Sequence, residues 1–292
     1  MLLSWLTGIL LAVQPLNIPD SISLVHEGQT IAIVDRKDFM IPLPGTPVID
    51  GEKLDLFTAK LEGQIYRPPL NARINESGGI TSEKKGSMLY KKAFKERFYM
   101  SFFSKGPVKL EIPQLPVHPR VDSELLGNIR TNQLAHYVTY FNRSNESRSH
   151  NISLAAKAID NHVVFPGETF SFNGVVGRRT SDKGYMRAPV IVRGELSEGV
   201  GGGICQVSST LFNAVDRAGL HIVQRFSHSR LVPYVPKGRD ATVSWYGPDF
   251  RFQNRFNQPI LIRAKAYGGS MMVMISSSDV IHVPPKKSTN MR

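Results

Sequence analysis

The sequence predicts an α+β fold: a mixed, largely antiparallel sheet packed on a few helices, with the cysteine at a helix N-terminus, preceded by a smaller α+β domain. Apolar residues at Val207, Leu211, Ala214 and Ala218 recur at helical spacing, and Gly219 follows as a C-cap. The end of the chain is rich in strand-like runs around a Gly-Gly turn at 268–269; these runs are 241–245, 250–253, 260–266 and 271–275.

Prolines mark a domain boundary near residue 120. Four of them, at positions 107, 113, 116 and 119, stand in an extended stretch where no helix can continue. We therefore expect an edge strand that passes into a linker. The predicted organisation is a candidate signal or membrane-anchor segment at 1–20, an N-terminal α+β domain at 21–120, a larger domain at 121–285 and a basic tail at 286–292.

Short elements are predicted on both sides of this boundary. Before it, we expect strands at 31–34 and 64–66 and a helix at 87–103, whose lysines and arginine are more typical of a solvated face than of an anion site. After it, we expect a helix at 149–161 with Ser149 or Asn151 as its cap. Further strands are predicted at 163–165, 169–172, 189–192 and 220–223.

Composition indicates a folded, basic protein. Of 292 residues, 41% are hydrophobic and 21% charged, and 36 Lys+Arg against 24 Asp+Glu leave a net charge of +12. Such a charge favours polyanionic neighbours: nucleic acid, anionic lipid or a cell wall with phosphate polymers. Because the chain shows no helix-turn-helix, aromatic-rich strand motif or zinc pattern, we do not expect it to bind nucleic acid.

The N-terminus opens with an apolar run from Met1 to Val13. This run is shorter than the roughly 20 residues needed to cross a bilayer, and it has the length of a signal-peptide core without the usual preceding basic residues. We favour export over the alternative of a buried first strand or helix, which places the protein outside the cytoplasm, in the wall or at the membrane.

The single cysteine, Cys205, stands between a glycine-rich loop and the predicted helix. One cysteine excludes an intramolecular disulfide and a multi-cysteine zinc site. At a helix start, free N–H groups and the helix dipole lower a thiol pKa and can stabilise an oxyanion. We favour a nucleophile over a buried structural cysteine, although Phe212 on the same side suggests a helix buried on both faces.

A nucleophilic thiol needs a base, and His228 is the first candidate. It lies in a polar, basic segment, 225–230, that follows the helix and a short strand. His221, at the start of that strand, is the alternative, because Cys and His partners are neighbours in space rather than in sequence. Asp240 could orient the imidazole or could pair locally with Arg239; the spacing leaves both open.

Several motifs together resemble the VanW family. They are Gly201–Leu211 (GGGICQVSSTL), His228–Arg230, Tyr234–Ala241 (YVPKGRDA) and the upstream Phe165–Asn173 (FPGETFSFN), and the resemblance covers roughly residues 140 to 270. The region 62–117 resembles, more loosely, the peptidoglycan-binding modules that often precede such domains. The family takes its name from glycopeptide-resistance clusters, and some members act as L,D-transpeptidases through a cysteine acyl-enzyme.

The resemblance implies a nucleophile at Cys205, a base at His228 and a two-step acyl transfer on peptidoglycan stem peptides. Substrate-binding residues would come from the same motifs: Gly201, Gly202, Gly203, Gln206, Ser208, Ser209, Ser229, Arg230, Tyr234 and Arg239. Water as acceptor would make the same site a carboxypeptidase. The other classes are a non-catalytic wall-binding or resistance accessory protein and a cysteine endopeptidase or amidase. No metal or organic cofactor is expected, and the expected partners are stem peptides and anionic wall polymers or a membrane surface.

Overall fold

The computed structural model describes residues 20–41, 43, 47–192 and 195–283. The apolar run 1–13 and the basic tail 286–292 lie outside the described residues. By its contacts the chain divides into two compact units, one made of residues 1–70 and 84–119 and the other of 71–83 and 120–292. No helix within the described ranges has the length and apolar character required to cross a membrane.

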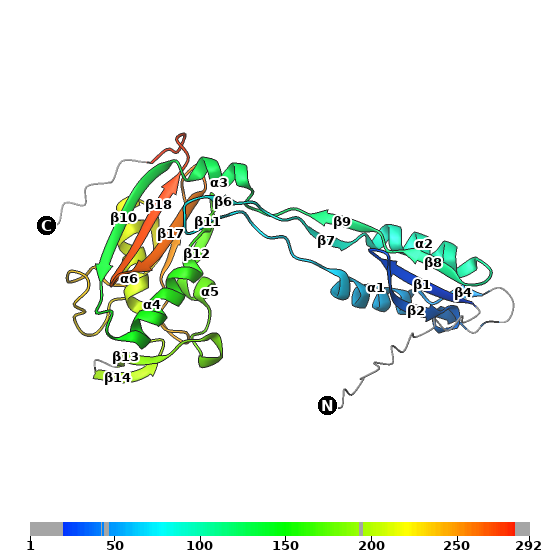
Figure 1. The fold of residues 1–292 in the computed structure, drawn as a ribbon, viewed down its shortest axis with the longest axis horizontal. Helices are drawn as coiled ribbons and strands as arrows, with labels where there is room; N and C mark the ends of the chain where they lie inside the picture. Colours follow the sequence, from blue (N-terminus) through cyan, green and yellow to red (C-terminus); the bar gives the residue numbers. More distant parts are fainter. Residues whose placement is uncertain (1–19, 42, 44–46, 193–194, 284–292) are drawn as a thin grey trace, which may run out of the picture. The chain divides into compact units, whose positions relative to one another are not determined.

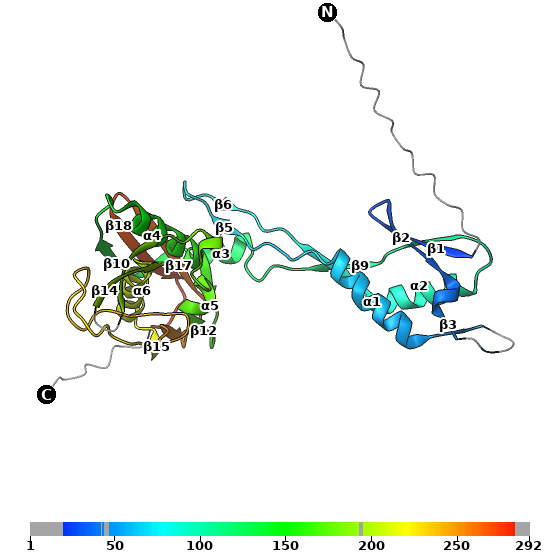
Figure 2. The same ribbon diagram turned by 90° about the horizontal axis from the view of Figure 1, so that it is seen from below.

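The first unit packs two helices on a small sheet (Figures 1 and 2). Strand β1 (Ser21–His26) pairs antiparallel with β2 (Gln29–Asp35) and parallel with β8 (Val108–Glu111). Its core is formed by apolar residues of β1, β8 and the two helices, α1 (Gly51–Ile65) and α2 (Lys91–Phe103). The shorter elements are η1 (Arg36–Phe39), β3 (Met40–Ile41), β4 (Val48–Ile49), β7 (Gly86–Leu89) and β9 (Gln114–Val117).

Two predictions for this unit differ from the structure. The predicted strand 64–66 is wrong: Ile65 ends α1, which Asp50 caps at its start, and Leu54, Leu61 and Ile65 are buried at helical spacing. The predicted helix 87–103 begins only at Lys91, because β7 takes the preceding residues into a pair with β9. Strand 31–34 is confirmed as part of β2.

The second unit is built on a four-stranded antiparallel sheet in the order β10 (Asn132–Tyr140), β18 (Ser270–Ser277), β17 (Ile260–Tyr267) and β11 (His162–Val164). Along β17, Ile260 and Ile262 belong to the main core, whereas Leu261 faces a second cluster on the other side. This alternation follows from the two-residue period of a strand. The α+β class with largely antiparallel sheets is thus confirmed.

Helices cover both faces of this sheet (Figure 1). On one face lie α4 (Glu146–Ile159) and α6 (Ile204–Ala218), which also contact each other. On the other lie α3 (Ser123–Ile129) and the hairpin of β5 (Arg73–Ile74) and β6 (Ile80–Thr81), through Ala72, Ile74 and Leu126. These contacts group residues 71–83 with the second unit, whereas the sequence placed them in the N-terminal domain.

Smaller elements complete the second unit beside the main sheet. A three-stranded sheet has the order β12 (Thr169–Ser171), β16 (Arg251–Gln253) and β15 (His221–Gln224). The remaining elements are α5 (Phe172–Val176), η2 (Ser181–Lys183) and the hairpin of β13 (Arg187–Val192) and β14 (Glu195–Val200).

Most predicted elements of this unit are confirmed within a residue or two, including the hairpin turn at Gly268 and Gly269, both with positive φ. The N-cap of α4 is Asn145, whose side chain accepts a hydrogen bond from the backbone N–H of Arg148. The predicted caps Ser149 and Asn151 are therefore wrong, because both lie inside the helix. The predicted strand 241–245 is also wrong: Ala241 bonds to serine side chains of α6 and not to a strand. Strand β10 was missed because its burial does not alternate.

Candidate active site

The glycine loop places the start of α6 against neighbouring backbone. A Cβ on Gly202 would lie 2.6 Å from the carbonyl oxygens of Ala188 and Pro189, so only glycine fits there. Gly203 is the N-cap of α6 with a φ of 108°, a conformation that side chains other than glycine rarely adopt. Asn151 of α4 donates to Gly202 O at 3.0 Å and fixes the loop from the other side.

Helix α6 is buried on nearly all sides. The predicted apolar stripe is confirmed, with Val207, Leu211, Ala214 and Ala218 all in the core, and Gly219 is the C-cap with a φ of 81°. Phe212 is buried as well, as its position beside Cys205 suggested. Because the helix is buried on its polar side too, its polar side chains need partners within the protein.

Those polar side chains bind the segments that flank the cysteine. Ser208 donates to Ala241 O, and Ser209 accepts from Ala241 N at 2.9 Å. Gln206 donates to Thr139 Oγ1 at 3.0 Å and to Tyr140 O at 2.9 Å. These three side chains, predicted to bind substrate, therefore join α6 to β10 and to the segment 240–243.

Cys205 is the second residue of α6, as predicted for a cysteine in the first helical turn. It is partly buried, and its Sγ lies 3.5 Å from Val243 O and 3.8 Å from Thr242 Oγ1. Burial alone would raise the pKa of the thiol, but hydrogen bonds with His228, the Val243 backbone and Thr242 and the charge of His228 outweigh it. The net effect is a pKa below the usual value of a cysteine.

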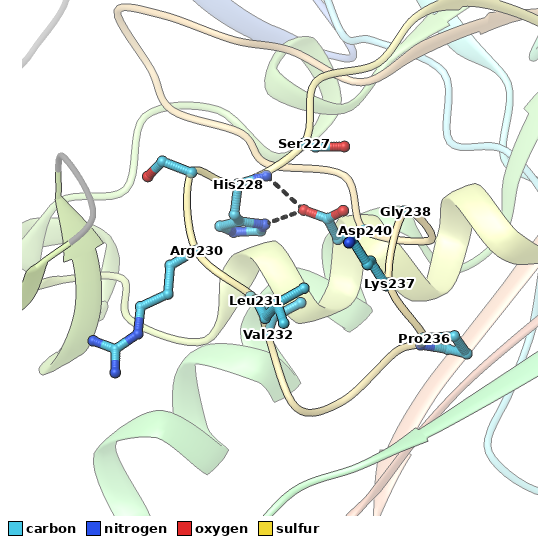
Figure 3. Close-up of a pocket in the computed structure, with 10 residues that line it drawn as sticks. Ser227, His228, Arg230, Leu231, Val232, Pro236, Lys237, Gly238 and Asp240 are labelled. Carbon is cyan, nitrogen blue, oxygen red and sulfur yellow. Dashed lines mark hydrogen bonds and ion pairs between the residues drawn. The ribbon is translucent and has the colours of Figure 1, made fainter.

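His228 and Asp240 form the remainder of the arrangement (Figure 3). The Nδ1 atom and the backbone nitrogen of His228 both lie 2.6 Å from Asp240 Oδ2. The side chains are only 6% exposed for His228 and 9% exposed for Asp240. Since Nδ1–H donates to Asp240, Nε2 is the ring atom left for the hydrogen bond with Cys205. Burial would lower the pKa of His228, but Cys205 and Asp240 raise it overall.

The Asp240 carboxyl is held in its charged form. Burial would raise its pKa, but the two hydrogen bonds from His228 and the charge of the imidazolium lower it overall. Arg239 does not pair with Asp240. It donates to Asp216 Oδ2 at 2.8 Å and to Asn213 Oδ1 at 2.7 Å, and so it binds the segment that contains Asp240 to α6. Together, Cys205, His228 and Asp240 bring a thiol, an imidazole and a carboxylate into one series, an arrangement that can serve as nucleophile, base and orienting group.

A pocket of about 320 Å³ borders the His228–Asp240 pair. Figure 3 shows Arg230 extended away from that pair, with Leu231 and Val232 below the imidazole. Ser229 and Arg230, two of the predicted substrate-binding residues, are exposed and line this pocket, whereas Cys205 does not line it. The pocket therefore adjoins the carboxylate side of the pair.

The charge of the Cys205 thiolate acts on three further groups, Tyr234, Arg148 and Arg179. Tyr234, predicted from the motif, is mostly buried and hydrogen-bonded to Ser209, and burial raises its pKa. Arg148 and Arg179 were not predicted, because they belong to distant parts of the chain; the charge of Cys205 acts on both.

His221, the alternative base, is exposed on β15. Within the described ranges no cluster of three or more His, Cys, Asp or Glu side chains could hold a metal ion.

Comparison with known proteins agrees with the motifs around this site. A model of the family described as "VanW like protein" matches residues 147–276. YoaR of Bacillus subtilis (strain 168), described as uncharacterized, is 64% identical over 277 residues, which cover 95% of this chain and 91% of YoaR. The chain belongs to the VanW family.

A second relative lies further away. The vancomycin B-type resistance protein VanW of Enterococcus faecalis (strain ATCC 700802 / V583) is 35% identical over 116 residues, which cover 37% of this chain and 42% of that protein. No solved structure matches. The matched region of the VanW domain contains Arg148, Arg179, Cys205, His228 and Asp240, so the whole candidate site lies within the family domain.

Proposed function

We propose that this VanW-family protein acts on peptidoglycan stem peptides by cysteine acyl transfer, as an L,D-transpeptidase-like crosslinking enzyme or a carboxypeptidase. The observation that carries the proposal is the buried His228–Asp240 pair, joined at 2.6 Å, whose imidazole acts on the thiol of Cys205 and lowers its pKa. A structural cysteine would not need a buried imidazole whose other nitrogen is held by a buried carboxylate. The lowered pKa of the thiol and the raised pKa of the imidazole favour the thiolate–imidazolium pair over the neutral pair.

The reaction has two steps. The Cys205 thiolate attacks the carbonyl carbon of the penultimate residue, and the electron pair of the C=O bond moves to oxygen. When this intermediate collapses, the C–N bond breaks and the His228 imidazolium gives its proton to the leaving amine, which leaves a thioester. An amine of a neighbouring stem then attacks the thioester, His228 takes its proton, and the thiolate is released; water in place of the amine gives hydrolysis.

The start of α6 supplies an oxyanion donor. The N–H groups of Ile204 and Gln206 donate to Gly201 O and Gly203 O. The N–H groups in the first turn of a helix lack the usual acceptor four residues earlier, and these two bond to loop carbonyls instead. The N–H of Cys205 lies between them and is suited to the oxygen of the intermediate.

Two observations support a location in the cell envelope. A protein named for vancomycin resistance is among the relatives, and the net charge of +12 suits a wall that contains anionic polymers or a membrane surface. On this proposal the protein works outside the cytoplasm, and its partners are stem peptides together with the anionic polymers or lipids around them.

The test is incubation with purified disaccharide-peptides followed by mass analysis. We expect dimers or stems shortened by one residue, and a thioester on Cys205. Cys205→Ser should abolish both, and His228→Ala should lower acylation by about a hundredfold or more, the scale of losing a general acid–base group. His221→Ala, the matched histidine control, should do neither. Cleavage inside the stem would instead identify an endopeptidase or amidase, and wall binding without products an accessory protein.

A further inference from the structure

Two arginines from distant parts of the chain lie against the loop that leads into Cys205. A Cβ on Gly203 would lie 3.0 Å from Arg148 Cγ, and one on Gly201 would lie 3.1 Å from Arg179 Cβ. The aliphatic parts of both arginines therefore pack directly on the glycine loop. Arg148 comes from the first turn of α4, and Arg179 follows α5, so the tertiary fold brings two separate segments to the glycine loop that precedes Cys205.

Each guanidinium is positioned by buried amides. Arg148 Nη2 donates to Gln206 Oε1 at 2.8 Å, and Gln206 is itself tied to β10. Arg179 Nη1 donates to Asn173 Oδ1 at 2.8 Å and to Gly177 O at 3.0 Å. Such bonds fix the direction of a guanidinium through one nitrogen and leave other N–H groups of its fork to bind a ligand.

Neither arginine has a carboxylate partner at ion-pair distance within the described part of the chain. Burial lowers the pKa of both, and the negative group that acts on both is the Cys205 thiolate. Asp249 acts on Arg179 as well, but its oxygens accept from Ser171 Oγ at 2.6 Å and from Asn173 N at 2.9 Å. When the thiolate becomes a thioester its charge is lost, and two partly buried cations remain beside the acyl group.

We infer that Arg148 and Arg179 bind the free C-terminal carboxylate of the donor peptide, so that the enzyme acts only where one residue remains after the scissile bond. This inference rests on the proposed function. Covalent geometry places the terminal carboxylate carbon about 3 to 4 Å from the attacked carbonyl carbon, within reach of groups that flank the thiol. Two guanidinium groups can hold its two oxygens with charge-assisted hydrogen bonds. The site is then exo-acting, and it releases one terminal amino acid for each thioester formed.

The first experiment uses Cys205 itself and needs no peptide. Iodoacetate and iodoacetamide alkylate the same thiolate and differ in whether a carboxylate or an amide stands beside the reacting carbon. We expect the ratio of their rates at Cys205 to exceed the ratio for a free cysteine peptide by about tenfold or more, the scale of a charge-assisted bond. Any change in the pKa of the thiol affects both reagents equally and cancels in the ratio.

Arg148→Gln and Arg179→Gln should each reduce this ratio toward that of the free peptide, while reaction with iodoacetamide shows that the thiol is still present and accessible. The matched control is Arg217→Gln, which removes the same charge from the exposed end of α6. Arg148→Lys should recover part of the ratio, because the charge returns without the fork. A ratio in the wild type equal to that of the free peptide overturns the inference.

The second experiment compares two peptide donors that differ only in a free carboxylate or a carboxamide at the C-terminus. We expect kcat/KM to be at least about a hundredfold higher for the free acid, and the arginine variants to remove most of this difference. Equal turnover of both donors overturns the carboxylate site and leaves acyl transfer standing, with the arginines serving the oxyanion. Iodoacetate selectivity with no product from either donor supports the carboxylate site and overturns the proposed function.

Discussion

Replacement of Asp240 by asparagine tests the link between the carboxylate, the imidazole and the thiol. The backbone N–H and the Nδ1–H of His228 are directed at one oxygen, Asp240 Oδ2, each at 2.6 Å. The amide oxygen of asparagine can take that place and accept both bonds, so the local fold should persist. What the substitution removes is the negative charge beside the imidazolium.

The size of the effect follows from these two bonds. A hydrogen bond to a charged group contributes about 1.5–3 kcal/mol against about 0.5–1.5 for a neutral one. Of these two bonds only the one from Nδ1 becomes stronger when the imidazole is protonated to imidazolium, so the ion pair loses about 1.4 kcal/mol, which is about tenfold in the thiolate population. We expect alkylation of Cys205 near neutral pH to slow about tenfold, and acyl transfer to fall further because the imidazole is less well oriented.

The assay is the pH dependence of alkylation between about pH 5 and 9. Cys205 is the only cysteine, so the mass of the intact protein reports its modification. In the wild type the reaction should persist below the pH at which a free cysteine stops reacting, since hydrogen bonds and the charge of His228 lower the pKa of the thiol against the opposing effect of burial. In Asp240→Asn the profile should move to higher pH.

Asp216→Asn is the matched control, because it makes the same change in an ion pair with Arg239 that does not reach the thiol. Stability should follow the same groups. Because the folded-state pKa of Asp240 is lowered, its contribution is present above about pH 4, the unfolded value, and is lost as the pH falls through the folded-state pKa. An unchanged alkylation profile in Asp240→Asn, with the fold intact, would refute the linkage.

Three further outcomes are expected. Gly202→Ala should destabilise the second unit or displace the start of α6, since its Cβ would lie 2.6 Å from two carbonyl oxygens. Gly63→Ala, with open space at its Cβ, is the control. The free energy of unfolding of both variants is measured by urea denaturation. Leu211→Ala should lower the free energy of unfolding by about 2–5 kcal/mol, because Leu211 is 0% exposed; a loss below about 1 kcal/mol would mean that the core is loosely packed. Binding to isolated cell walls should weaken steeply between about 50 and 500 mM salt if the charge of +12 holds the protein there, whereas salt-independent binding would indicate a specific pocket.

Local patterns determined much of the second unit. The spacing of Val207, Leu211, Ala214 and Ala218 predicted α6 with Cys205 in its first turn, because helical periodicity and a glycine cap are properties of neighbouring residues. The hairpin at Gly268 and Gly269 was predicted for the same reason. Strand β10 was missed because its burial follows no regular period and depends on distant partners. The segment 64–66 was assigned wrongly, because three residues at the end of α1 are too few to show the helical period of Leu54, Leu61 and Ile65.

The sequence by itself determined that Cys205 begins a helix after a glycine loop, and it named His228 and Asp240 as candidates. Only the tertiary structure decided that Asp240 binds His228 and not Arg239. It also decided that Ala241, which was predicted to lie in a strand, forms hydrogen bonds with serine side chains of α6. The approach of Arg148 and Arg179 to the same loop was also decided at that level. The physical reason is that hydrogen-bond partners and charges meet across distances set by packing, and no spacing along the chain encodes which side chains will face one thiol.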